Sequence, residues 1–418
     1  MDSPLASRVE SLRHQFPALS RTLDGRPVVF FDGPAGTQVP QRVIGAIGRY
    51  LAECNANHGG HFATAVESDR RLDEAHAAYA RFVGASDPDE IAFGQNMTSL
   101  TFALSRALSK TWKAGDEVVV TRLDHDANVT PWIRAAEDAG ATVRFVDIDP
   151  ESCTLDMKSF HAALGERTRL VAFGGASNSV GTLNPIGDLV RAAKQFGALV
   201  FVDAVHLAPH RRLQVERWGC DFLVCSPYKF FGPHLGVMWG RRELLERLPA
   251  YKVRPAPESL PGRWMTGTQS HESICGAVAA IDYLADLGRD LAGDSSLSDS
   301  VAWDRAFDEV ERYEGGLAKR FLAGVAELPA WKVWGANDPR DVDGRVSTFA
   351  LTHRRYPSAE TARRLGERGI FAWHGNYYAL QLSERLGREP EGMLRIGMVH
   401  YNTTQEVDRL LSELAAID

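Results

Sequence analysis

The sequence is poor in cysteine and lacks the signatures of several large protein classes. It has five cysteines and no CxxC pair, so neither a disulfide framework nor a zinc site is indicated. No apolar run approaches the roughly 20 residues of a membrane helix, and the N-terminal stretch has no signal-peptide core. No GxGxxG follows a predicted strand and no P-loop motif occurs, which argues against a nucleotide site.

Basic residues are also fewer than acidic ones. The chain has 47 lysines and arginines against 54 aspartates and glutamates, a net charge of −7, so the basic face that nucleic-acid binding requires is not expected. Charged residues make up 24% and hydrophobic residues 44%, the balance of a folded globular protein. The 418 residues predict two or three domains. We therefore expect a cytoplasmic protein that binds neither nucleic acid nor membrane.

Short apolar runs alternate with helical patterns between residues 91 and 240, and this alternation predicts an α/β fold. Strand, helix and strand at this spacing indicate a mainly parallel sheet with helices on both faces. The last two runs are about ten residues apart, too close for a helical crossover, so they predict one antiparallel pair. Seven strands are expected, at 91–93, 117–120, 142–146, 170–173, 199–202, 222–225 and 236–239.

The pattern changes after Ile274, and a second, smaller α+β domain is predicted there. A long helical pattern covers 301–328, strands are expected at 347–351, 370–373 and 394–396, and helices at 359–367 and from Thr404. The stretch 288–300, rich in Gly, Asp and Ser, predicts an exposed loop. The predicted division is an N-terminal segment 1–40 that joins the small domain, a large domain 41–273, and a small domain 274–418.

The most informative stretch is Ser226-Pro-Tyr-Lys-Phe-Phe-Gly-Pro233, which follows a buried strand. A lysine directly beyond such a strand is unusual, because an unpaired ammonium is costly to bury. Lys229 is thus a candidate Schiff-base lysine, with Ser226 and Tyr228 as hydroxyl donors to a phosphate. A plain surface-loop lysine is the alternative.

Polar clusters follow four more strands, where ligands of α/β sheets bind. Asp203 ends a strand and would pair with a protonated pyridine nitrogen, as pyridoxal phosphate needs, or cap a helix. Asn96, Met97 and Thr98 open a helix whose amides would hold a phosphate. His125 would stack on a cofactor ring or be a loop residue, and Asn178 would reach a ring hydroxyl or be a turn residue. Asp124 and Asp126 lack a third ligand nearby, so no metal is predicted.

Together these motifs resemble the class V aminotransferases, which have pyridoxal-phosphate fold type I, and within them the cysteine desulfurases of the Suf type. The resemblance runs from Phe31-Asp-Gly-Pro-Ala-Gly-Thr-Gln38 to Tyr401-Asn-Thr403. It implies pyridoxal 5'-phosphate as cofactor, a large domain with the seven-stranded sheet, and a homodimer with shared active sites. Its most specific element is the Lys229 stretch, which matches the family's Ser-x-His-Lys-x-x-Gly-Pro.

The resemblance also implies a role for individual residues. Lys229 would hold the cofactor covalently, Asp203 would bind the pyridine nitrogen and His125 would stack on the ring, and these three are the predicted catalytic residues. Arg395 would hold the substrate carboxylate. The remaining predicted cofactor ligands are Asn96, Met97, Thr98, Asn178, His206, Ser226, Tyr228 and, across the dimer interface, Thr268. The remaining substrate-binding residues are Asn178 and Trp373 and, across the dimer interface, Asn57 and His58.

Three departures from the family pattern bear on function. The family's Asp-Gly-Ala-Gln reads Asp203-Ala-Val-His206, and its phosphate-binding histidine is Tyr228. The desulfurase loop Arg-x-Gly-His-His-Cys corresponds to Trp373-His-Gly-Asn-Tyr-Tyr378, which puts a tyrosine where the sulfur-accepting cysteine would be. A persulfide-forming desulfurase needs a thiolate there.

These observations predict an enzyme that acts on a small α-amino acid. We expect desulfurase-like carbon–sulfur cleavage by β-elimination without a persulfide cysteine. A class V aminotransferase or an epimerase is the alternative, because all three reactions begin with removal of the α-proton. A binding protein that has kept the fold without turnover is a minor alternative, against which the retained Lys229, Asp203, His125 and Arg395 argue.

Overall fold

A seven-stranded sheet forms the centre of the molecule. The structure is a computed structural model that describes residues 3–417. The strand order is β4-β10-β9-β8-β7-β5-β6, and β10 runs antiparallel to both of its neighbours while the other pairs are parallel. The predicted sheet and its antiparallel pair are confirmed. The strands are β4 (Ile91–Gly94), β5 (Glu117–Thr121), β6 (Thr142–Val146), β7 (Thr168–Gly174), β8 (Leu199–Asp203), β9 (Phe222–Cys225) and β10 (Gly236–Gly240).

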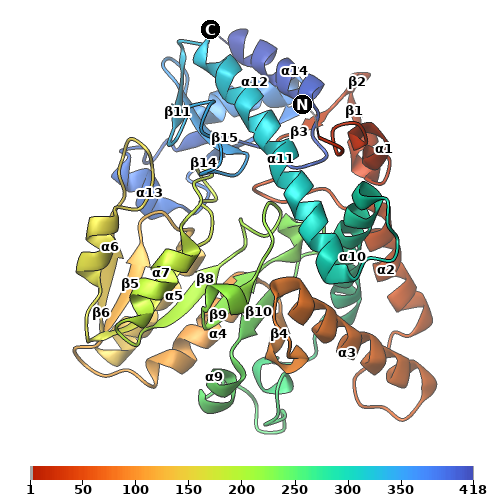
Figure 1. The fold of residues 1–418 in the computed structure, drawn as a ribbon, viewed down its shortest axis with the longest axis vertical. Helices are drawn as coiled ribbons and strands as arrows, with labels where there is room; N and C mark the ends of the chain where they lie inside the picture. Colours follow the sequence, from red (N-terminus) through yellow and green to blue (C-terminus); the bar gives the residue numbers. More distant parts are fainter. Residues whose placement is uncertain (1–2, 418) are drawn as a thin grey trace.

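Helices cover both faces of this sheet, because successive strand residues point to opposite sides (Figure 1). Val118 and Val120 of β5 pack with Trp132 of α5, whereas Val119 belongs to the core that contains Leu189 of α7. Apolar strands buried on both faces thus explain the continuous hydrophobic runs. The helices of this part are α3 (Ala63–Val83), α4 (Met97–Ser109), α5 (Thr130–Ala139), α6 (Met157–Ala163), α7 (Ile186–Lys194), α8 (Val215–Trp218) and α9 (Arg242–Arg247).

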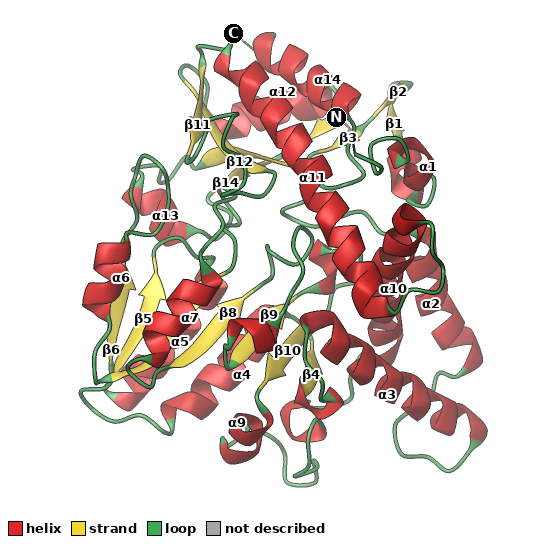
Figure 2. Ribbon diagram, viewed as in Figure 1, coloured by secondary structure: helices red, strands yellow, loops and turns green. Residues whose placement is uncertain are grey.

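A four-stranded antiparallel sheet of order β11-β12-β15-β14 lies in the C-terminal part, beyond the central sheet (Figure 2). The long helix α11 (Asp299–Ala326) runs from this sheet toward α10 (His271–Ala292) and packs against it (Figure 1). The remaining elements here are β11 (Trp331–Trp334), β12 (Thr348–His353), β13 (Ile370–Phe371), β14 (Trp373–Gly375), β15 (Met393–Gly397), α12 (Ser358–Glu367), α13 (Leu380–Arg385) and α14 (Thr404–Ala415).

The N-terminal segment lies beside the C-terminal part of the chain. Strand β3 (Val29–Phe30) pairs in parallel with β13, and Asp32 forms a bridge to Gly397. This segment also holds α1 (Val9–Arg13) and the hairpin of β1 (Thr22–Leu23) and β2 (Arg26–Pro27), and α2 (Gln41–Glu53) follows. Residues 1–40 thus lie beside elements of the predicted small domain. The domain boundaries at 40 and 273 stay predictions, since α10 packs on α2 as well as on α11.

One local prediction is wrong and another has bounds that are too wide. The expected strand at 370–373 is two short strands in different sheets, since β13 pairs with β3 and β14 with β15. The expected loop at 288–300 is an exposed loop only over 293–298, because α10 extends to Ala292 and α11 begins at Asp299. Gly288 is there for close packing: a Cβ at this position would lie 1.8 Å from the carbonyl oxygen of Ala302, so glycine lets α10 and α11 approach.

None of the helices within residues 3–417 combines the length and the apolar character that crossing a bilayer requires.

Candidate active site

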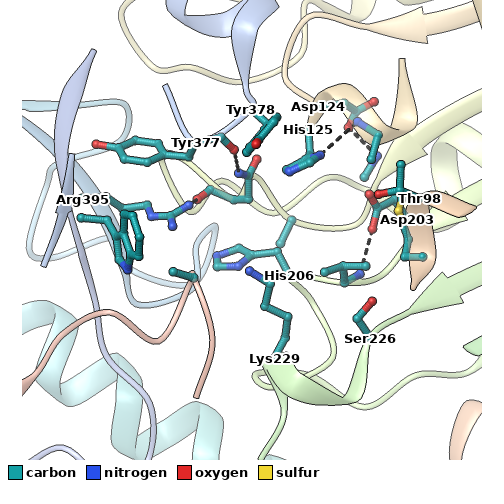
Figure 3. A pocket seen from close by; sticks show the side chains of 18 of the residues that line it. Thr98, Asp124, His125, Asp203, His206, Ser226, Lys229, Tyr377, Tyr378 and Arg395 are labelled. Carbon is teal, nitrogen blue, oxygen red and sulfur yellow. Dashed lines mark hydrogen bonds between the residues drawn. The ribbon is translucent and has the colours of Figure 1, made fainter. Parts of the chain in front are cut away.

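A cavity of about 490 Å³ opens where the parallel strands of the central sheet end, facing β14 and β15 of the smaller sheet (Figure 3). Loops after β5, β7, β8 and β9 line it, together with the first turn of α4 and the segment 373–378. This is the edge at which α/β sheets bind ligands, since the carboxyl ends of parallel strands converge there.

Most of the predicted site residues line this one cavity. Those it brings together are Asn96, Met97, Thr98, His125, Asn178, Asp203, His206, Ser226, Tyr228, Lys229, Trp373 and Arg395. Asn57, His58 and Thr268 do not line it: all three are exposed, and His58 Nδ1 lies 2.6 Å from Asp69 Oδ1. The prediction for these three concerns the partner subunit's cavity, so it stays a prediction.

Lys229 lies at the bottom of the cavity, in the turn that follows β9. Its ammonium donates a hydrogen bond to the carbonyl oxygen of Pro34. Burial lowers the pKa of Lys229 to about 7; the positive charge of Arg395 lowers it further, while Asp203 opposes the shift. A large share of the amine is therefore neutral near pH 7, and a neutral amine is the nucleophilic form.

Asp203 supplies the negative charge opposite Lys229. It ends β8, and its Oδ1 accepts a hydrogen bond from the Val205 amide at 2.9 Å. Burial raises the pKa of Asp203 to about 6, while the Val205 amide and the charge of Lys229 lower it. Above pH 6 the group is mainly a carboxylate, suited to a cationic ligand atom such as a protonated ring nitrogen.

The first turn of α4 forms one end of the cavity. Asn96 caps the helix, its Oδ1 accepting the Ser99 amide at 2.9 Å, and the first amides of a helix have no intrahelical partner. Gly236 of β10 allows this close approach, because a Cβ there would lie 2.4 Å from the Asn96 carbonyl carbon. With the hydroxyls of Ser226 and Tyr228 in the same cavity, the arrangement suits a phosphate.

His125 has a fixed orientation and is neutral. Its Nδ1 accepts a hydrogen bond from the Ala127 amide at 3.0 Å, and burial lowers its pKa to about 4, with Lys229 and Arg395 lowering it further.

Asp124 connects the loop after β5 to the end of β7. Its Oδ1 accepts a hydrogen bond from the Gly174 amide at 2.6 Å, and its Oδ2 is 3.4 Å from Asn128 Nδ2. Among the described residues no three acidic, histidine or cysteine side chains form a metal-binding group.

His206 is also buried and neutral. Its Nε2 lies 3.0 Å from the Thr348 hydroxyl in β12, so the small sheet helps to orient the imidazole. Burial and the nearby charges and imidazole lower its pKa well below the usual range. Behind it His210 pairs with Glu314 of α11 at 2.6 Å, and the two imidazole centroids are 5.5 Å apart.

Arg395 of β15 closes the far side of the cavity. Its Nη1 donates to the backbone carbonyl of Asn178 at 2.8 Å, and its guanidinium carbon lies 4.2 Å from the centroid of the Tyr377 ring. Burial lowers its pKa to about 10, so it stays cationic at neutral pH. An arginine in an apolar strand could instead form a salt bridge to a neighbouring glutamate, but the hydrogen-bond partner here is a backbone carbonyl.

Several lining residues were missed or left open by sequence reasoning. Ala35, Ala127 and Val205 line the cavity without any chemical signal in the sequence. Aromatic residues after a strand, such as Tyr377 and Tyr378, are consistent with either a core or a pocket position, and both line the cavity. Their backbone conformation marks them as unusual, because both are non-glycine residues in the left-handed region, at φ 55° and 60°. The sequence does not show this conformation.

The fold is fold type I of the pyridoxal-phosphate enzymes. A family comparison matches "Aminotransferase class-V" over residues 29–410, and the chain belongs to that family. A cysteine desulfurase of Enterobacter sp. (strain 638) is 30% identical, with 98% of both chains covered. A probable cysteine desulfurase of Synechocystis sp. (strain ATCC 27184 / PCC 6803 / Kazusa) is 28% identical, with 99% of this chain and 96% of the other covered.

Two solved structures show the same fold. A cysteine desulfurase from Thermococcus onnurineus NA1 superposes with a TM-score of 0.85 at 23% identity, covering 100% of this chain and 98% of that one. A cysteine desulfurase from Escherichia coli superposes with a TM-score of 0.82 at 24% identity, covering 98% of both.

The class V family uses pyridoxal 5'-phosphate, and the residues present fit this group. The cavity contains a buried amine of lowered pKa, a carboxylate opposite it, and the start of a helix with two hydroxyls beside it. Asn178 adds a further sign: its Nδ2 donates to the Tyr377 carbonyl at 2.9 Å, but its buried Oδ1 has no partner among the described residues. A buried acceptor without a donor is costly, and a bound hydroxyl group would satisfy it.

Proposed function

We propose that this class V enzyme cleaves a carbon–sulfur bond of a small α-amino acid by β-elimination, without a persulfide cysteine. The observation that carries the proposal is the composition of the cavity. Lys229, Asp203 and Arg395 line it together, whereas none of the five cysteines does, all of which lie within residues 3–417. The sulfur chemistry is supported by relatives that are cysteine desulfurases.

Each residue of the cavity would have a distinct role in such a reaction. Bound pyridoxal 5'-phosphate would supply an electron sink for a carbanion at the α-carbon. Arg395 would hold the α-carboxylate through its planar fork, so the α-hydrogen takes a defined direction. Lys229 would accept that proton, for which a pKa near neutrality is well matched. Asp203 would keep its partner nitrogen protonated, and neutral His125 would present its ring face.

The cysteines support the absence of a persulfide route. Persulfide formation needs a thiolate, and burial raises the pKa of Cys153 and Cys220 to about 12 and that of Cys275 to about 11. Burial also raises the pKa of Cys54 and Cys225. All five thiols are therefore protonated near neutral pH.

Single replacement of each of the five cysteines is expected to leave turnover within about twofold of the parent enzyme, since none contacts the reacting atoms. Turnover with L-cysteine and trapped protein persulfide are the quantities to measure. Serine is suitable at the less buried Cys275 and alanine at the other four positions. A variant that folds normally and loses a persulfide signal present in the parent would restore the desulfurase mechanism.

Arg395→Lys is expected to weaken amino-acid binding about 10- to 100-fold and cofactor binding much less. A lysine keeps the charge but loses one of two parallel hydrogen bonds, and charge-assisted bonds contribute roughly 1.5–3 kcal/mol. Spectroscopic titrations with an amino acid and with pyridoxal 5'-phosphate separate the two affinities. Arg388→Lys, outside the cavity, is the matched control; unchanged amino-acid affinity in Arg395→Lys would remove Arg395 from this role.

Transfer of the amino group is the second candidate, supported by the match to the class V aminotransferase family, and epimerisation shares the same first step. Incubation with a panel of L-amino acids and mass spectrometry of the products separates the three. Pyruvate with ammonia indicates elimination, a keto acid with the amine form of the cofactor indicates transfer, and racemised substrate indicates epimerisation. No spectral response to any amino acid would favour a non-catalytic binding protein.

We further propose that the enzyme is a homodimer in which Thr268, Asn57 and His58 reach the partner subunit's cavity. Their exposure in the single chain supports this. The chain on either side of residues 57 and 58 also carries large apolar side chains that are exposed: Ile44, Leu51, Phe62 and Val66. Exposed apolar surface is typical of protein–protein contacts when it is contiguous.

A further inference from the structure

The mouth of the cavity carries two large aromatic rings that solvent reaches. In the single chain Trp373 is 54% exposed and Tyr378 is 72% exposed, and both line the cavity. Apolar rings left open at the entrance of a binding site have surface to bury against a ligand. The whole segment 373–378 lines the cavity, so this stretch forms one continuous wall.

Trp373 stands beside the group that would hold the carboxylate. Trp373 of β14 pairs directly with Arg395 of β15, and directly paired residues of neighbouring strands have their side chains on the same face of the sheet. An amino acid held by Arg395 would therefore have the indole next to it.

Tyr378 is held in place rather than free. Its backbone is left-handed, which is unfavourable for a bulky residue and persists where the surroundings enforce it. Its carbonyl accepts the Asp126 amide at 2.7 Å, and Tyr377 before it is fixed by Asn178 and by its own hydroxyl, which donates to the Met393 carbonyl. The Tyr378 ring stacks on His125 with centroids 5.3 Å apart and planes inclined by 24° (Figure 3).

We propose that these rings select the substrate's sulfur substituent, and that the substrate is an S-substituted cysteine whose substituent is flat and apolar. This rests on the function proposed above. A thioether suits a cavity without a thiol, because its sulfur leaves together with its substituent and needs no cysteine to accept it. Trp373 and Tyr378 would then flank the departing group.

The reaction is balanced without an oxidant or reductant. The α-proton goes to Lys229, the bond between the β-carbon and sulfur breaks with its electron pair on sulfur, and the thiolate takes a proton from water at the open mouth. Over the whole reaction one S-substituted cysteine and one water give one thiol, one pyruvate and one ammonium ion.

The test compares S-phenyl-L-cysteine with S-methyl-L-cysteine, measuring released thiol and pyruvate. We expect kcat/KM to be at least about tenfold higher for the phenyl compound. Thiophenolate is the better leaving group, and the stacked aromatic contact adds about two- to twelvefold beyond the area it buries, which is the part that the ring variants remove. Tyr378→Ala should remove about tenfold of that preference by raising KM for the phenyl compound more than for the methyl compound. Tyr378→Phe, which keeps the ring, should retain the preference.

Further variants and measurements test whether a lost preference comes from the removed ring or from misfolding. Trp373→Ala should act in the same direction as Tyr378→Ala. Phe196→Ala removes an exposed ring outside the cavity and should not change the preference. Calorimetric dissociation constants for the two compounds, measured in a Lys229→Ala background, report binding apart from turnover. Circular dichroism and thermal unfolding show whether each variant is folded.

The outcomes separate the two proposals. If amino acids change the cofactor spectrum and pyruvate forms, but the phenyl and methyl compounds are used and bound equally, the substituent proposal is overturned and the elimination remains. The substituent proposal is likewise overturned if folded Tyr378→Ala and Trp373→Ala variants keep the full preference. If no amino acid produces a spectral response, the proposed function itself fails, and the substituent proposal fails with it.

Discussion

Lys229→Ala is expected to abolish covalent attachment of the cofactor and to lower turnover on the order of 10⁴-fold. The variant loses both the amine that would bind the cofactor and the base at the α-carbon, and a positioned base alone contributes roughly 10²–10⁴-fold. Borohydride reduction of the parent, followed by peptide mapping, should place the adduct on Lys229. Lys110→Ala, at an exposed position outside the cavity, is the control and should keep both properties.

The lowered pKa of Lys229 adds a pH dependence to this prediction. When cofactor is mixed with cofactor-free enzyme, the attachment rate should rise as pH increases through about 7, because deprotonation creates the nucleophilic amine. An ordinary lysine, with a pKa near 10.5, would show that rise about three pH units higher. A reduced adduct on another lysine would contradict the assignment of Lys229.

Asp203→Asn is expected to lower kcat on the order of 10²–10³-fold while the fold is kept. The amide has nearly the same shape, and its oxygen is still able to accept the Val205 amide, but the negative charge in the cavity is lost. Groups that stabilise charge developing in a reaction typically contribute about 10²–10³-fold, and a neutral ring nitrogen makes a poorer electron sink. Stability should change little, since removing one buried charge also removes its desolvation cost.

Turnover and the cofactor's absorption spectrum are the measurements for Asp203→Asn. Asp188→Asn, an exposed carboxylate on α7 outside the cavity, serves as the matched control. In the cofactor-free parent enzyme, cofactor affinity should rise with pH through about 6 as Asp203 ionises, and this rise should vanish in the variant. A variant as active as the parent would exclude the proposed role of Asp203.

Much of the large sheet was accessible from sequence because its signals are local. The run at 236–239 is an example: the short spacing from the preceding strand predicts an antiparallel neighbour, and β10 pairs in that way with β9. The polar groups after each strand were accessible for the same reason, since a parallel sheet brings its carboxyl ends to one edge. That rule alone places His125, Asp203 and Lys229 near each other.

The small domain was less predictable, because its short strands depend on distant partners. Nothing in the four residues 370–373 indicates that Ile370 pairs with Val29 while Trp373 pairs with Arg395. Likewise the composition of 288–300 indicates a loop, whereas only 293–298 is one, and Gly288 belongs to α10 where it packs closely against the Ala302 carbonyl. In both cases a contact between segments outweighs the local preference.

The sequence alone determined the class of this protein, because the strand pattern and the Lys229 stretch are contiguous in the chain. Tertiary structure alone decided the electrostatic state and the shape of the site. Burial next to Arg395 lowers the pKa of Lys229, and the sequence order contains no measure of that burial. The left-handed Tyr378, stacked on His125 from 253 positions earlier in the chain, is likewise a product of folding. The types of the site residues and their motifs can be read from the sequence. The burial of these residues and the distances between them are set only when remote segments pack together.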